Sequence, residues 1–198
     1  MNQKGCFVFD SHWNYFLALE ADLAATSRYV DFHESNYSTF SIEFARLIMA
    51  AAAEFEVVAK AICRASYGDV AEKANIVTLR DKIIHRYPEF CTHQVNLPRF
   101  HMDSTPWAEW KEASTPLWWA GYNAIKHNRS HRFAEANLKN AIDAASGLLV
   151  GLLYLHDAQY KKSLRVDGFL RPKILVPHGA GGEAWDGKFE YPIQPNKD

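Results

Sequence analysis

The apolar segment around residue 150 constrains the fold more than any other part of the chain. Residues 133–162 follow the pattern of one long helix, and residues 144–155 are apolar or small throughout. The broad apolar stripe of this helix comprises Leu138, Ala141, Ile142, Ala145, Leu148, Leu149, Leu152 and Leu155. A second, flatter face comprises Gly147, Val150, Gly151 and Tyr154. Two apolar faces predict that the helix packs against the core on one side and against a partner on the other.

Four further helices are predicted ahead of this segment. The first covers residues 11–32, with Ser11 as its N-cap. The second covers residues 41–66, and the third begins at a cap provided by Asp69. The fourth begins near Pro116, because proline suits the first turn of a helix. In the second helix one apolar stripe comprises Phe44, Leu47, Ile48, Ala51, Phe55, Val58 and Ile62, which predicts a central position for it.

The remaining segments lack helical periodicity. Residues 89–115 contain several prolines and histidines, so we expect a loop with a short helical turn near Trp107. Residues 164–198 are rich in proline and glycine, so we expect an irregular tail that is extended or pairs as a β-hairpin around Asp186. The predicted domains are a helical domain over residues 1–163 and this tail, which wraps the body or a neighbouring subunit. The predicted fold class is all-α, an antiparallel bundle of four to five helices.

Net charge, cysteine content and the length of the apolar runs limit the classes of protein to which the chain can belong. The formal charge of −1 at pH 7 gives the whole molecule no attraction to nucleic acid or membrane, so any anion site has to be a local patch. Cys6, Cys63 and Cys91 are an odd number without metal-site spacing, as expected in a reducing compartment. The apolar run at residues 6–9 is too short for a signal-peptide core, and no apolar run reaches the roughly 20 residues of a membrane span. We therefore expect a soluble cytoplasmic protein without a membrane partner.

Residues 118–132 combine aromatic side chains with a run of cations at the joint between the last two predicted helices. Asn123 and His127 share a helix face, whereas Trp118 and Tyr122 point roughly the other way. A histidine can transfer a proton near neutral pH, and cations can bind phosphate or stabilise a developing negative charge. The candidate catalytic residues are His127 and Asn123, and the candidate nucleic-acid-binding residues are Lys126, Arg129, His131 and Arg132. The alternative is that these cations only complement the dipole at a helix C-terminus.

A second candidate site lies in the third predicted helix, where Arg80 and His85 are the candidate catalytic residues. The arginine could stabilise a phosphate while the histidine transfers a proton. In a regular helix, however, about 140° of rotation separates these two positions. The alternative is a solvated face of an amphipathic helix that includes Arg80, Asp81 and Lys82.

Other kinds of site have weaker sequence support. His127 and His131 have the spacing of a helical metal pair, yet no glutamate follows His127, so we expect no metal ion and no cofactor. A third hypothesis is a small-molecule pocket, because clustered aromatic side chains can line a cavity as well as a core. Its lining would be Trp107, Trp110, Trp118 and Trp119.

The order of the helices, with Asn123 and His127 at the entrance to the last one, resembles the HEPN superfamily of small helical domains over about residues 11–162. Many members of that family carry an arginine, a polar residue, three variable residues and a histidine near the start of the last helix. Here Asn123 and His127 match the polar residue and the histidine, but Tyr122 stands where the arginine would be. The literal pattern, with a tyrosine two residues after the histidine, occurs in the third helix as Arg80, Asp81, His85 and Tyr87.

The resemblance implies a function. Active members of the family are metal-independent ribonucleases that work as dimers in toxin, abortive-infection and related defence systems. The implied mechanism is attack of an RNA 2′-hydroxyl on the neighbouring phosphate, with a histidine moving the proton and a cation stabilising the charge. The expected partners are RNA or a nucleotide, an antitoxin, and a second copy of the chain across the face of Gly147, Gly151 and Tyr154. The alternative hypothesis is a non-catalytic assembly module in which the cationic residues are structural.

Overall fold

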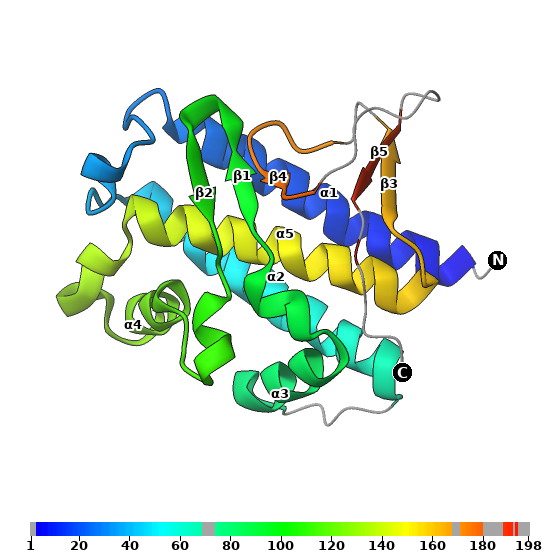
Figure 1. The fold of residues 1–198 in the computed structure, drawn as a ribbon. Helices are drawn as coiled ribbons and strands as arrows, with labels where there is room; N and C mark the ends of the chain where they lie inside the picture. The colour runs from blue at the N-terminus through cyan, green and yellow to red at the C-terminus, as the bar shows by residue number, and fades with distance from the viewer. Residues whose placement is uncertain (1–2, 69–73, 168–170, 180–187, 192, 194–198) are drawn as a thin grey trace.

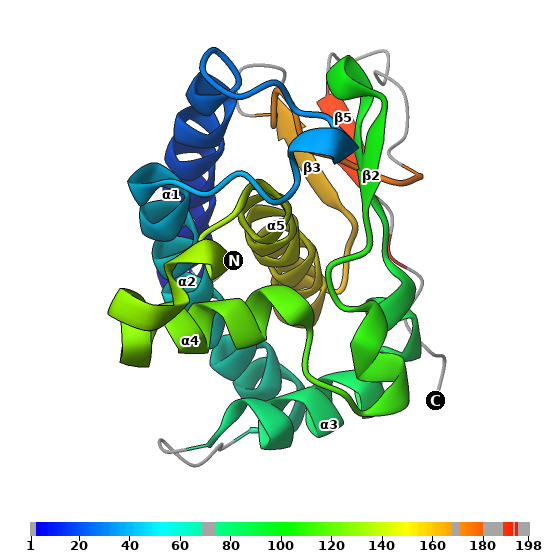
Figure 2. The same ribbon diagram turned by 90° about the vertical axis from the view of Figure 1, so that its left-hand side faces the viewer.

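The computed structural model describes residues 3–68, 74–167, 171–179, 188–191 and 193, and most of them are helical. The α-helices are α1 (Gln3–Thr26), α2 (Ile42–Tyr67), α3 (Ile76–Arg86), α4 (Leu117–Arg132) and α5 (Leu138–Tyr160) (Figure 1). Helix α1 runs in the opposite direction to α2 and α5, while α3 and α4 cross below them (Figures 1 and 2). The predicted helical bundle is confirmed.

Helix α5 is the central element of this bundle. Figure 2 shows α1 and α2 on one side of it, the strands on the other side and α4 below. Every residue from 141 to 155 is buried, so the prediction that one face of this helix is free for a partner is wrong. The reason is close packing on the face of Gly147 and Gly151: an added Cβ at Gly147 would lie 2.9 Å from the Trp118 ring, and one at Gly151 would lie 2.9 Å from the Phe55 ring.

The composition of α5 would also suit a membrane span. It is the one helix in the described part of the chain with the required length and apolarity, but 94% of its apolar window is buried inside the protein. Burial of this kind is typical of the core helix of a soluble protein, because a membrane-spanning helix turns part of its surface to lipid. The helix is therefore part of the core.

Hydrogen bonds at the helix ends explain most of the boundaries. Helix α2 begins where predicted because Ser41 Oγ accepts a hydrogen bond from the backbone N–H of Phe44 at 3.0 Å. It ends before Gly68, whose φ of 82° lies in the left-handed region that glycine tolerates. Helix α3 begins after Asn75, which caps the N–H of Thr78 at 2.9 Å. Asp69, the cap that the sequence suggests, lies outside the described residues.

The boundaries of α1 differ from the prediction at both ends. The helix begins at Gln3, so Ser11 lies inside it and is not its N-cap; no proline interrupts the preceding residues. It ends at Thr26 and not at residue 32. The hydroxyls of Thr26 and Ser27 each donate a hydrogen bond to a carbonyl of the last turn at 2.7 Å, an arrangement that competes with further helix.

Short strands replace the loop that was expected at residues 89–115. Strands β1 (Val95–Leu97) and β2 (Met102–Ser104) pair antiparallel, and β4 (Val176–Pro177) from the tail pairs with the other edge of β1. Short 3₁₀ helices surround this sheet, including η4 (Ala108–Glu112), which follows Trp107 where a helical turn was expected. Strands of this length carry too few residues to show an alternating pattern.

The C-terminal tail packs on the body of its own chain. Strand β3 (Leu164–Asp167) pairs antiparallel with β5 (Lys188–Tyr191), so the tail contains paired strands, whereas the turn of the hairpin expected around Asp186 lies outside the described residues. Apolar tail residues enter the core, among them Leu164, Ile174, Leu175 and Tyr191. The tail thus covers the face of α5 opposite α2 (Figure 2).

Candidate functional site

Helix α4 changes direction near its C-terminal end. Asn128 has φ −146° and ψ 48°, which are not helical values, and one further turn leads to Arg132. The 3₁₀ helix η5 (Phe133–Glu135) then connects α4 to α5. The predicted joint between the last two long helices is therefore present, and it lies at the surface, at the left-hand edge of the view in Figure 2.

Aromatic side chains fix α4 to the core. Trp118, Trp119, Tyr122 and Ile125 are all buried, and Trp118 Nε1 donates a hydrogen bond to the carbonyl of Pro106 at 2.8 Å. Because these positions occupy one side of the helix, the polar residues between them face solvent. The exposed set comprises Asn123, Lys126, His127, Arg129, His131 and Arg132, and we call it the cationic joint.

The side chains of the cationic joint differ in how freely they can bind an anion. Arg132 forms an ion pair with Glu135 at 2.7 Å. Lys126 Nζ donates to Tyr122 Oη at 3.1 Å, and this hydrogen bond raises the pKa of the lysine. His127, Arg129 and His131 make no hydrogen bond or ion pair with any described residue. Within the described residues Arg129 thus has no acidic partner, whereas Arg132 has one.

Tyr122 occupies the position at which the HEPN pattern has arginine. Its side chain is 3% exposed, and its ring packs edge-on against Trp119 with a centroid distance of 5.3 Å. The tyrosine anchors the helix and orients Lys126, which also lies over the ring at 5.2 Å. The buried tyrosine therefore holds the ammonium group of Lys126 in place at the exposed surface of α4.

An apolar groove of about 760 Å³ adjoins the cationic joint between α2 and η5. It is lined by Ile42, Ala45, Arg46, Met49, Ala50, Arg129 and Phe133. Arg129 and Phe133 thus place a cation and an aromatic ring on one groove. Sequence reasoning missed the α2 side of this groove, because the residues that meet there are about 80 positions apart and no local pattern links them.

The second motif is not assembled into a site. Arg80 is held by Asp81 at 2.8 Å and by the carbonyl of Ala113 at 2.6 Å, and its side chain is 13% exposed. His85 is exposed and lies near the ring of Tyr67, on a different face of the helix. Figure 1 also shows α3 at the bottom of the molecule, away from the left-hand edge where α4 ends. Arg80 and His85 therefore converge neither on each other nor on the cationic joint.

The tryptophan cluster belongs to the core. The rings of Trp107 and Trp110 are 4.1 Å apart, those of Trp107 and Trp118 are 4.9 Å apart, and Trp107 also lies 4.2 Å from Phe55. At these distances the rings are in direct contact, and they fill the space between them. The hypothesis of a small-molecule pocket lined by these tryptophans is therefore wrong.

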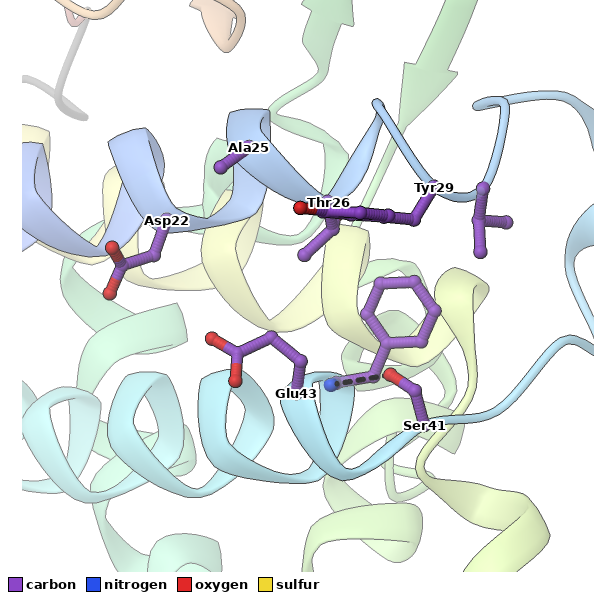
Figure 3. A pocket seen from close by; sticks show the side chains of 8 residues that line it. Asp22, Ala25, Thr26, Tyr29, Ser41 and Glu43 are labelled. Carbon is purple, nitrogen blue, oxygen red and sulfur yellow. Dashed lines mark hydrogen bonds between the residues drawn. The ribbon is translucent and has the colours of Figure 1, made fainter.

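A second hollow lies between the end of α1 and the start of α2 and was not predicted (Figure 3). Its volume is about 380 Å³, and its lining includes Tyr29 and Phe44. Asp22 and Glu43 point toward each other across its rim in Figure 3, and both bind Arg46, whose pKa they raise. We call it the α1–α2 pocket.

A buried polar cluster also escaped sequence reasoning. Tyr87 donates a hydrogen bond to Asp157 at 2.9 Å, and His93 Nδ1 lies 3.3 Å from Tyr154 Oη. Burial lowers the pKa of His93 to about 4 and raises the pKa of Glu89. His93 Nε2 and one Glu89 oxygen are buried without a partner. The cluster joins α5 to the segment after α3, and no cavity opens onto it among the pockets described above.

No group of three or more His, Cys, Asp or Glu side chains in the described ranges is arranged to hold a metal ion. Comparison of the chain with protein-family models, with curated proteins and with solved structures finds no match.

Proposed function

We propose that the protein binds RNA at the cationic joint, with cleavage of the bound strand by His127 as the catalytic form of this function. The observation that carries the proposal is that His127, Arg129 and His131 are exposed together and are free of acidic partners among the described residues. With a formal charge of −1 the whole molecule has no general affinity for polyanions. The positive charge of Arg129, with Lys126 three positions earlier, is therefore the local feature that phosphate would recognise.

The groove beside the cationic joint favours a nucleic acid over a simple anion as the ligand. Phe133 lines it next to Arg129, and its ring meets Phe40 at 5.7 Å. An aromatic ring beside a cation suits a nucleotide, because the base can stack while the phosphate binds the guanidinium. The proposed ligand is thus RNA or a nucleotide derived from it.

The chemistry proposed for cleavage needs no metal ion. Neutral His127 would take the proton from the 2′-hydroxyl as that oxygen bonds to the adjacent phosphorus. The bond from phosphorus to the 5′-oxygen would break to leave a 2′,3′-cyclic phosphate, the 5′-oxygen would take up a proton from water, and His127 would return its proton to solvent. Lys126 and Arg129 would stabilise the extra negative charge on the phosphate. Asn123 lies four residues before His127 on the same exposed face and could bind a phosphate oxygen.

The biological setting follows from the HEPN resemblance alone. It predicts a cytoplasmic toxin or defence protein that is held in check by an antitoxin. This setting stays a prediction, to be tested after RNA binding itself.

The test uses fluorescently labelled single-stranded RNA in buffer with EDTA. We expect Arg129→Ala and Lys126→Ala to weaken binding, and Arg64→Ala to leave it unchanged. Arg64 is a matched control because it is an exposed arginine at the far end of α2. Equal binding by all three variants would contradict the proposal and favour the non-catalytic assembly module.

The same samples test cleavage. Loss of cleavage in His127→Ala, with binding retained, would identify the histidine as the proton-transfer group. If cleavage is lost only in Arg80→Ala or His85→Ala, the active site lies on α3. Binding without cleavage by the natural chain would leave an RNA-binding protein in which Tyr122 has replaced the catalytic arginine of the family pattern.

A further inference from the structure

The α1–α2 pocket combines an apolar wall with negative charge at its rim. Its volume of about 380 Å³ lies within the range of small-molecule sites, roughly 300–1,000 Å³. Ala25, Val30 and the rings of Tyr29 and Phe44 form the apolar wall, while Asp22 and Glu43 stand at the rim (Figure 3). None of its lining residues belongs to the cationic joint or lines the groove beside Phe133, so a ligand here leaves both of them open.

The two aromatic rings of the pocket lie in different surroundings. Phe44 is 1% exposed and belongs to the core, whereas Tyr29 is 87% exposed. In Figure 3 the Tyr29 side chain extends from the turn after α1 back towards Thr26, which also lines the pocket. The Tyr29 hydroxyl makes no hydrogen bond with any described residue. The tyrosine ring is therefore open to a ligand, because packing within the chain leaves most of its surface uncovered.

The ionised groups at the rim are two carboxylates and one guanidinium, which leaves one negative charge in excess. Asp22 Oδ2 accepts a hydrogen bond from Arg46 Nη2 at 2.6 Å, and Glu43 Oε1 accepts one from Arg46 Nε at 2.8 Å. Each carboxylate binds Arg46 through one oxygen, so its other oxygen has no partner among the described residues. These hydrogen bonds raise the pKa of Arg46, so the arginine stays protonated and the excess negative charge persists at neutral pH.

We propose that the α1–α2 pocket binds a small organic ammonium ion with an apolar body. The apolar body packs between Phe44 and Tyr29, and the ammonium group donates hydrogen bonds to the free oxygens of Asp22 and Glu43. The face of the tyrosine ring also attracts the cation. One positive charge on the ligand balances the excess negative charge of the rim, so a monocation binds better than an anion or a neutral molecule. The proposal does not depend on RNA binding.

An NMR titration of the backbone amides with phenethylammonium tests the site. The shifted resonances should cluster in residues 22–30 and 41–44, which line the pocket. The dissociation constant should be at least about tenfold lower than that of the uncharged analogue phenethyl alcohol, because the alcohol lacks the charge that the ring and the carboxylates attract. Hydrocinnamate, which has a similar body and a negative charge, should bind more weakly than the alcohol. A titration in which these residues do not shift, or in which the alcohol binds equally well, would overturn the proposal.

Substitutions in the pocket separate the contribution of charge from that of packing. Asp22→Asn and Glu43→Gln should each raise the dissociation constant of phenethylammonium at least about threefold and leave that of phenethyl alcohol unchanged. Glu112→Gln is the matched control, because Glu112 is an exposed glutamate of η4 outside the pocket. Tyr29→Ser should weaken the binding of both molecules. Tyr15→Ser should weaken neither, because Tyr15 is 44% exposed on α1 and does not line the pocket.

Replacement of Arg46 should improve binding. In Arg46→Gln the rim carries two negative charges without a guanidinium, so both carboxylates are free for the ligand and the dissociation constant of phenethylammonium should fall at least about threefold. A circular dichroism spectrum like that of the natural chain shows that the variant has folded. A pair of carboxylates that only anchors the arginine predicts no such gain. Unchanged or weaker binding by folded Arg46→Gln would overturn the proposal, and so would unchanged binding by both Asp22→Asn and Glu43→Gln.

Discussion

The carboxylate of Glu20 on α1 accepts a hydrogen bond from the backbone N–H of Ile174 in the tail at 2.7 Å. The same side chain accepts from the neighbouring N–H groups of Lys173 and Leu175 at 2.7 Å and 3.0 Å. Glu20 is only 2% exposed, so this carboxylate is a buried charge satisfied by three successive amides. It holds residues 171–179, and with them β4, against the body of the protein.

Replacement of Glu20 by alanine should release the tail. Three buried N–H groups would lose their acceptor, and we expect the free energy of unfolding to fall by about 2–4 kcal/mol. Urea denaturation measures this loss, and limited proteolysis should cut the variant near residues 171–175 before it cuts the natural chain. Glu112→Ala, at an exposed glutamate of η4, is the control and should change neither measurement.

Stability should fall with acidity because of His93. Burial, with a smaller contribution from His178, lowers the folded-state pKa of His93 from 6.5 to about 4. Between these pH values the unfolded chain binds more protons than the folded one, so stability is full above pH 6.5 and is lost as the pH falls towards 4. The expected loss is about 3 kcal/mol for this group.

Urea denaturation at several pH values checks the contribution of His93. His93→Gln should flatten the profile between pH 6.5 and pH 4, because glutamine does not titrate. Burial also lowers the pKa of His156, so His156→Gln is the companion variant. It should retain most of the fall in the free energy of unfolding between pH 6.5 and pH 4, because His93 is still present. An unchanged profile in His93→Gln would show that the imidazole is not a neutral buried group.

Gly147→Ala should destabilise the protein although alanine is the better helix former. The new Cβ would lie 2.9 Å from Trp118 and 3.2 Å from Trp107, and both rings are buried. We expect a loss of about 1–3 kcal/mol on urea denaturation. Ala53→Gly on the exposed side of α2 gives the ordinary helix penalty of glycine, about 1 kcal/mol, for comparison. A gain in stability from Gly147→Ala would contradict the close contact between α5 and the tryptophans.

If RNA binds at the cationic joint, its affinity should depend steeply on salt. Each phosphate contact contributes close to one unit to the slope of log affinity against log salt concentration. We expect Lys126→Ala and Arg129→Ala each to reduce that slope by about one. Fluorescence anisotropy at several salt concentrations measures it, and a slope unchanged in both variants would place the phosphate contacts elsewhere.

The cationic joint shows which features of the candidate site the local sequence can predict. The alternation of Trp118, Tyr122 and Ile125 with polar residues was enough to predict which side of α4 is buried, because a helix fixes the relative directions of its own side chains. The partners of those side chains were not predictable. Lys126 binds Tyr122 one turn away, but the groove beside Arg129 depends on α2, and Arg80 is bound by a carbonyl 33 residues distant.

The sequence by itself determined the helices, through apolar periodicity and through caps such as Ser41, since both act over a few residues. Only the tertiary structure decided that both faces of α5 are buried and that Ile42 at the start of α2 is exposed. The tertiary structure likewise decided that Glu20 accepts hydrogen bonds from tail residues more than 150 positions away. Contacts of this kind depend on which elements meet in space, and a periodic pattern records that a face is apolar without recording what covers it.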